Sequence, residues 1–313
     1  GGSMSNTAAF PVVPLLLAGF LWSFPSAAAG RIRLVTYNVE NYLLHDTGTR
    51  AAKTEASRSK VAEILRACEA DVIALQEIGG EAALAELRGR LARLGREYPH
   101  WELLRGYDTN IQVAVVSRLP ITRRRPHTKD TYLVAGRRFQ VGRGVLEADV
   151  AGPGGYTLTL FVAHLKSRRA VPEADEGEMR LAEARILRGK VDARLREDPR
   201  ANVVVLGDLN DAKDSAPVRA VIGRGRGALV DTRPGERNGD TGHTPNPRWE
   251  PRTVTWTHYF GREDSYGRID YVLLHPNAGR EWVRAGSHVV ALPEWGLASD
   301  HRALLVTLEA VDR

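Results

Sequence analysis

Polar residues suited to acid–base or metal chemistry stand at the ends of short apolar segments in this chain. Six such ends read Tyr37-Asn38, Gln76-Glu77, His164, Asp208-Leu209-Asn210, Asp270 and Ser299-Asp300-His301. Burying these groups without a partner would cost free energy, so they must meet one another, an ion or a substrate. A single Asn or Asp at a strand end is usually only a turn residue. Six ends of this kind in one chain are better explained by one shared site.

The residue types in this set favour a particular chemistry. Oxygen ligands without cysteine suit a hard cation such as Mg²⁺, with Mn²⁺ or Ca²⁺ as alternatives, and do not suit structural zinc. Histidines and free carboxylates supply proton transfer and orientation. A metal that offsets phosphorane charge, beside groups that activate water, meets the needs of phosphodiester hydrolysis. The sequence contains no GxxxxGK[ST] loop, GxGxxG fingerprint or GxSxG elbow, which disfavours nucleotide motors, dehydrogenases and hydrolase-fold esterases.

The segments that must position these residues alternate between strand-like and helix-like patterns. Helical periodicity is found over 57–70, 81–94 and 173–196. Apolar runs of strand length occupy 32–38, 72–76, 111–117, 145–150, 156–165, 202–207, 268–274, 287–291 and 303–308. Two groups of strands with helices outside them predict a layered α/β sandwich, formed by a single domain over 31–313.

Five short motifs resemble those of the endonuclease/exonuclease/phosphatase superfamily. They are residues 36–41 (TYNVEN), 75–77 (LQE), 207–210 (GDLN), 268–271 (RIDY) and 299–301 (SDH), in the family's order. The superfamily includes pancreatic-type deoxyribonucleases, abasic-site repair endonucleases, bacterial sphingomyelinases and inositol polyphosphate 5-phosphatases. The resemblance implies a four-layer α/β sandwich with two central, mostly antiparallel β-sheets flanked by helices. It places the site across the tops of these two sheets.

The resemblance also implies a role for each motif residue. Glu77 corresponds to the principal metal ligand, with Asn38 beside it, and Asp300 to a ligand of the same or a second metal. Asp208 and Asn210 correspond to the pair that orients the attacking water and holds a phosphate oxygen. His301 corresponds to the general base or a phosphate-contacting imidazole, which Asp270 orients. His164 stands where deoxyribonucleases and sphingomyelinases carry a phosphate-binding histidine, whereas abasic-site endonucleases usually have tyrosine.

Substrate contacts are less well defined. Ile78-Gly79-Gly80 follow Glu77 where several nuclease branches carry a basic residue. Lys166 and Arg168, just after His164, are candidate replacements, or they belong to the solvated start of the next helix. Trp256 lies in an aromatic segment, 255–260, that could stack on a base, enter a lipid interface or alternate into the core.

Basic residues are concentrated in one part of the chain. The net charge is +6, and residues 101–145 hold nine Arg or Lys against three acidic residues, which also gives +6. A local basic patch attracts polyanions, although such a run can equally be a solvated face.

The first 30 residues predict export. Gly1 to Ser3 precede Met4 and are set aside as a cloning remnant, the apolar run 12–22 is too short to span a bilayer, and Ala27 to Ala29 suit a signal peptidase. No Lys or Arg precedes this run, and an uncleaved anchor or a disordered tail are the alternatives. The expected location is secreted or periplasmic, with no stable membrane span. Cys68 lies on the apolar stripe of its predicted helix, so it is expected in the core.

These observations predict a secreted, metal-dependent phosphodiesterase, foremost a nuclease that hydrolyses DNA or RNA. The alternative is a phospholipid or sphingomyelin phosphodiesterase, or a phosphatase on small phosphoesters, with the same site chemistry. A binding protein on an inactive scaffold is disfavoured, because every motif acid, amide and imidazole is present. Nucleic acid is the expected partner, and no obligate protein partner is inferred.

Overall fold

The computed structural model describes residue 2, residues 30–238 and residues 253–313. The predicted export segment, apart from Gly2 and Gly30, lies outside these residues. Within the described part of the chain, none of the helices combines the length and the apolar character that crossing a bilayer requires.

Two large sheets form the centre of the molecule. The first has seven strands in the order β12 (Gly235–Glu236), β16 (Trp282–Val290), β17 (Ala303–Glu309), β1 (Arg31–Tyr42), β2 (Val72–Ile78), β4 (Gln112–Ser117) and β3 (His100–Leu104). The second has six, in the order β11 (Val230–Asp231), β15 (Asp270–Leu274), β10 (Asn202–Asp208), β9 (Thr157–His164), β8 (Val145–Ala151) and β5 (Ile121–His127). Most neighbouring strands are antiparallel, but β1–β2, β9–β10 and β12–β16 are parallel pairs. Parallel pairing matters here because it brings the carboxyl ends of both strands to the same edge of a sheet.

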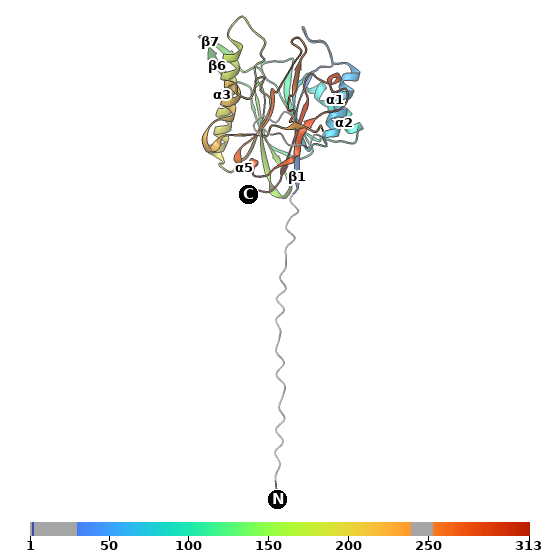
Figure 1. The fold of residues 1–313 in the computed structure, drawn as a ribbon, viewed down its shortest axis with the longest axis vertical. Coiled ribbons are helices and arrows are strands. Elements are labelled where there is room, and N and C mark those ends of the chain that lie inside the picture. The colour runs from blue at the N-terminus through green and yellow to red at the C-terminus, as the bar shows by residue number, and fades with distance from the viewer. Residues whose placement is uncertain (1, 3–29, 239–252) are drawn as a thin grey trace.

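Helices cover the outer face of each sheet, so the molecule has four layers (Figure 1). α1 (Glu55–Cys68) and α2 (Glu81–Arg93) pack on the first sheet, and α3 (Glu176–Glu197) and α4 (Ala216–Ile222) on the second. A third apolar cluster fills the space between the sheets. Both faces of each sheet are therefore buried, which explains the uninterrupted apolar run 203–206 in β10. The predicted four-layer α/β sandwich is confirmed.

The helix boundaries differ by a few residues from the predicted ones because capping side chains set them. Thr54 caps α1 by accepting a hydrogen bond from the Ser57 amide at 3.2 Å, and Asp175 caps α3 through the Glu178 amide at 2.8 Å. The sequence patterns missed several short elements, because they contain too few residues to show a period. These are the hairpins β6–β7 (Thr131–Val134, Arg137–Gln140) and β13–β14 (His258–Phe260, Ser265–Gly267), and the short helices α4 and α5 (Pro276–Gly279).

Cys68 lies in the core between α1 and the first sheet, as predicted. Burial raises the pKa of its thiol to about 12, so the reactive thiolate is scarce at neutral pH. We therefore expect the folded protein to be inert to 5,5′-dithiobis(2-nitrobenzoic acid) and to release one equivalent of thionitrobenzoate only after unfolding in guanidinium chloride. Rapid reaction of the native protein would contradict this placement.

Candidate active site

The strand ends of the two sheets meet at one edge of the sandwich. In the first sheet, β1 and β2 run parallel and carry Asn38 and Glu77 near this edge. In the second, His164 and Asp208 end β9 and β10 and are paired in register, and Asp270 begins β15 opposite Asp208. The topology thus accounts for the convergence of residues that lie far apart in the sequence.

Asn38 joins the two sheets. Its buried side-chain amide donates from Nδ2 to Glu77 Oε1 at 3.2 Å and to Asp208 Oδ2 at 2.9 Å. Its Oδ1 accepts from the Glu40 amide at 2.9 Å, and Glu77 Oε2 accepts from the Asn41 amide at 2.8 Å. Glu77 has a φ of 66°, which is strained for a residue with a side chain and is typical of functional sites. Two carboxylates from different sheets therefore converge on a single amide group.

His301 is oriented by Asp270. Its Nδ1 lies 2.7 Å from Asp270 Oδ2, and its Nε2 points toward Asp208 Oδ2 at 3.7 Å. Burial disfavours the charged ring, but the carboxylates of Asp270 and Asp208 outweigh this effect and hold the pKa of His301 well above its ordinary value. The ring is consequently a cation whose Nε2 proton is directed at the centre of the site.

Asp208 is enclosed by these groups. Its Oδ1 accepts from the Asn210 amide at 2.9 Å, and its Oδ2 lies 3.4 Å from His164 Nε2. Burial raises the pKa of Asp208 to about 7, and the nearby Asp270 carboxylate adds to this rise. A carboxyl group with such a pKa can exchange a proton at neutral pH.

His164 is buried, and its environment keeps it neutral. Desolvation lowers the pKa of His164 well below the ordinary value, and the cationic Arg143, His301 and Arg50 lower it further. Its Nδ1 has no hydrogen-bond partner among the described residues. Asn210 is held beside it with a φ of 54° and donates from Nδ2 to the Leu165 carbonyl at 2.8 Å.

Asp300 lies on the solvent side of the site. Its carboxylate is 3.4 Å from His258 Nε2 and 3.7 Å from His301 Nε2, and its backbone amide donates to Glu40 Oε2 at 2.9 Å. The rings of His258 and His301 are 4.5 Å apart. Motif reasoning missed His258, because it stands in an aromatic segment and only the β13–β14 hairpin brings it here.

Glu40 and Lys53 were also missed by sequence reasoning. Burial and the neighbouring Asp300 carboxylate raise the pKa of Glu40, while burial lowers the pKa of Lys53, whose Nζ donates to the Glu40 carbonyl at 2.8 Å. The position of Glu40 two residues after Asn38 was the only sequence signal for it.

The side chains predicted to contact substrate are not joined to this cluster by any hydrogen bond or ion pair in the described residues. Lys166 Nζ folds back onto the carbonyls of Ser167 and Arg169, both at 3.3 Å. Arg168 is exposed. Trp256 packs within an aromatic cluster, with the Arg302 guanidinium 3.4 Å from its ring centroid and the ring of Trp295 at 5.1 Å. The structure leaves the predicted substrate roles of these three residues untested.

Several basic residues of the segment 101–145 form ion pairs, some with acidic residues from other parts of the chain and some within the segment. Arg123 and Arg125 pair with Glu197 at 3.1 and 2.7 Å, and Arg124 pairs with Glu102 at 2.7 Å. Glu197 lies outside the segment, so its ion pairs reduce the positive charge at Arg123 and Arg125, whereas Lys129, Arg137 and Arg138 are exposed. The binding of a polyanion by this segment stays a prediction. Arg143 is different, because its Nη1 donates to the Leu165 carbonyl at 3.4 Å beside the site.

A divalent metal would fit the Asn38 side of the site. The carboxylates of Glu77 and Asp208 approach one amide nitrogen, and burial, followed by the nearby Asp270 carboxylate, raises the pKa of Asp208. A cation there would stabilise the charged carboxylates. The donors there are the carboxylate oxygens of Glu77 and Asp208, which suit Mg²⁺. Two other groups have ligand atoms within 4.8 Å of one another: Asp208, Asp270 and His301, and His258, Asp300 and His301.

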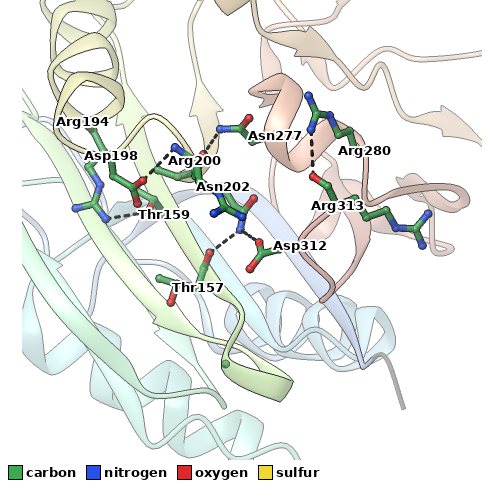
Figure 2. Close-up of a pocket in the computed structure, with 12 residues that line it drawn as sticks. Thr157, Thr159, Arg194, Asp198, Arg200, Asn202, Asn277, Arg280, Asp312 and Arg313 are labelled. Carbon is green, nitrogen blue, oxygen red and sulfur yellow. Dashed lines mark hydrogen bonds between the residues drawn. The ribbon is translucent and has the colours of Figure 1, made fainter. Parts of the chain in front are cut away.

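A polar cavity of about 370 Å³ lies elsewhere, at the opposite ends of β9 and β10. Figure 2 shows Asn202 at its centre, where Nδ2 donates to the Thr157 carbonyl at 3.1 Å and to Asp312 Oδ1 at 2.7 Å. Arg194, on its wall, pairs with Asp149 at 2.9 Å. None of the candidate active-site residues lines this cavity, which is separate from the candidate active site.

Comparisons with known proteins agree with this arrangement. The model of the "Endonuclease/Exonuclease/phosphatase family" matches residues 35–301. No match is found among curated protein sequences.

Three solved structures illustrate the similarity of fold. An endonuclease/exonuclease/phosphatase from Beutenbergia cavernae is 20% identical, with a TM-score of 0.59 over 90% of this chain and 72% of that one. The human Nocturnin catalytic domain with a bound sulfate anion is 15% identical, with a TM-score of 0.60 over 90% and 95%. A beta toxin from Staphylococcus aureus is 16% identical, with a TM-score of 0.59 over 88% and 99%. These structures show the shared fold, and the family-model match over residues 35–301 shows that the chain belongs to the endonuclease/exonuclease/phosphatase family.

Proposed function

We propose that this protein is a divalent-metal-dependent phosphodiesterase, and that its substrate is nucleic acid, DNA or RNA. One observation carries the proposal: Asp208 lies between the metal-suited pair Asn38–Glu77 and the Asp270–His301 pair. A phosphate group placed against Asp208 would meet an oxyanion-stabilising cation on one side and an imidazolium on the other. Phosphodiester hydrolysis requires stabilisation of the phosphate charge of this kind.

The chain's own residues can account for the proton transfers. Asp208 is held by Asn38 and the Asn210 amide, and its pKa of about 7 suits acceptance of a proton from the attacking water. His301, charged and fixed by Asp270, donates from Nε2 to a phosphate oxygen and stabilises the developing charge. His164 offers a neutral imidazole to the same phosphate. Glu77, with Asn38 beside it, would hold the metal, which would supply Lewis-acid stabilisation.

Cations around this cluster support a polyanionic substrate. Arg143 and Arg50 both act electrostatically on His164, and Lys53 lies beside Glu40. The net charge of +6 would add long-range attraction for nucleic acid. The apolar run 12–22 supports the further proposal that the protein is exported and acts in a secreted or periplasmic location.

A lipid substrate is the second candidate, and the β13–β14 hairpin favours it. Phe260 and Tyr266 are 40% and 58% exposed on this hairpin, which also carries His258 into the site. Exposed aromatic rings next to a catalytic cleft can enter a membrane interface, but they can also stack on bases. A parallel substrate assay distinguishes the two uses.

The test of metal dependence uses the full chain with plasmid DNA, RNA, sphingomyelin vesicles and bis-p-nitrophenyl phosphate. EDTA is expected to abolish hydrolysis and Mg²⁺ or Mn²⁺ to restore it. Because Glu77 is the proposed principal ligand, Glu77→Gln should raise the Mg²⁺ concentration for half-maximal activity by at least about 10-fold. Glu81→Gln, at the exposed start of α2, is the matched control. Hydrolysis indifferent to EDTA would refute the proposal, and selective cleavage of sphingomyelin would replace nucleic acid by lipid.

A further inference from the structure

His258, Asp300 and His301 form a second group of potential ligands on the solvent side of the active site. The potential ligand atoms of these residues all lie within 4.8 Å of one another. They comprise two imidazole nitrogens and one carboxylate oxygen, whereas the other side offers the carboxylate oxygens of Glu77 and Asp208. The two neighbouring regions therefore differ in the class of metal that they suit.

The backbone fixes this group. The Tyr259 amide donates to the Asp300 carbonyl at 2.9 Å, and the Arg302 amide donates to the Thr257 carbonyl at 2.7 Å. These two bonds form an isolated antiparallel bridge that places His258 opposite His301. The convergence of the three side chains thus does not depend on the flexible positioning of surface residues.

The surroundings of His301 resemble those of a metal-bound histidine. Metal-ligating histidines generally give their second ring nitrogen to a carboxylate, which orients the ring and raises its basicity. Asp270 holds Nδ1 of His301 in this way at 2.7 Å and leaves Nε2 directed toward Asp300. Asp208 and Asp270 add negative charge around the group.

Access and coordination number also suit an ion from solution. The Asp300 side chain is 39% exposed and that of His258 is 20% exposed, so an ion can enter without unfolding the hairpin. Three protein ligands leave a fourth position for water or a substrate oxygen, as in open zinc sites.

We propose that His258, Asp300 and His301 bind a borderline transition ion of the Zn²⁺ or Co²⁺ class, separately from the hard ion at Glu77. Binding releases the Nε2 proton of His301 to solvent, engages that nitrogen and removes it from contact with the phosphate. The bound ion therefore inhibits the hydrolysis that we propose for this site. Only the inhibition rests on the proposed function, because binding can be measured without any substrate.

Co²⁺ is the probe, because its visible absorption distinguishes tetrahedral nitrogen–oxygen sites from octahedral oxygen sites. The full chain, freed of metal, is titrated with Co²⁺ in the presence of millimolar Mg²⁺. We expect a four-coordinate spectrum at one equivalent, displaced by Zn²⁺ and not by excess Mg²⁺. His258→Phe should weaken binding by at least about 10-fold, whereas His100→Phe, on the distant edge strand β3, should leave it unchanged.

A spectrum that Mg²⁺ displaces, or one unchanged in His258→Phe, would overturn the site. If His258→Phe does not fold, as judged by circular dichroism, His258→Gln provides the same comparison with a polar side chain. In the activity arm, Zn²⁺ should inhibit the Mg²⁺-activated wild type. Co²⁺ binding without inhibition by Zn²⁺ would overturn the inhibitory role. A four-coordinate Co²⁺ spectrum in a protein that hydrolyses no phosphodiester would support the site while refuting the proposed function.

Discussion

Replacing His301 with alanine is expected to lower kcat/KM for a phosphodiester by about 10³- to 10⁴-fold at saturating Mg²⁺. The reason is that the substitution removes the charged Nε2 donor, and Asp270 loses the partner that it holds at 2.7 Å. The substrate for this measurement is the one that the protein hydrolyses in the parallel assay of DNA, RNA, sphingomyelin and bis-p-nitrophenyl phosphate. Steady-state rates of the wild type and the variant at equal concentrations, with circular dichroism as the folding check, provide the measurement.

A matched control is available in His100, which lies on β3 at the edge of the first sheet. His100→Ala should retain the wild-type rate within about twofold, because surface substitutions outside a site have small effects. His301→Gln keeps a neutral donor and should recover part of the lost activity if the ring acts by donating a hydrogen bond. A rate for His301→Ala within tenfold of the wild type would remove this residue from the mechanism.

Much of the site could be predicted from the sequence because its residues end buried strands. The apolar run before Asp208 marks β10, and the run before Asn38 marks β1. Parallel strands that end in polar residues bring those residues to a common edge, so convergence follows from the strand pattern and direction. The register pair of His164 and Asp208 is the structural result of that rule, whereas the contact between Asn38 and Asp208 also needs the packing of the two sheets.

Other features could not be predicted because they depend on pairing between distant segments. His258 reaches His301 through a two-stranded hairpin whose strands are only three residues long, too short for a period. Glu197, at the end of α3, pairs with Arg123 and Arg125 and so reduces the local positive charge that counting along the chain had indicated. Ion pairs between segments so far apart cannot be predicted from the local sequence.

Replacing Asp208 with asparagine is expected to lower turnover by about 10³-fold and, at pH 8, to stabilise the metal-free protein. Burial and Asp270 raise the pKa of Asp208 from 3.8 to about 7 in the folded state. Between these two pH values the folded protein holds a proton that the unfolded chain has released. The free energy of unfolding attributable to Asp208 therefore falls as the pH rises from about 4 to about 7, and above that it stays low.

Asparagine does not titrate, so the variant should lose this part of the pH dependence. A gain of about 1 kcal/mol at pH 8 would raise Tm by about 2 to 4 °C, while the difference from the wild type should shrink toward pH 4. Thermal unfolding in EDTA at both pH values measures this, with Asp192→Asn on the surface of α3 as the control. A variant that is inactive and also less stable at pH 8 would mean that Asp208 supports the fold through its hydrogen bonds to Asn38 and Asn210. An inactive variant that is more stable would show that this buried carboxylate is maintained at the expense of stability, as expected for a residue that serves catalysis.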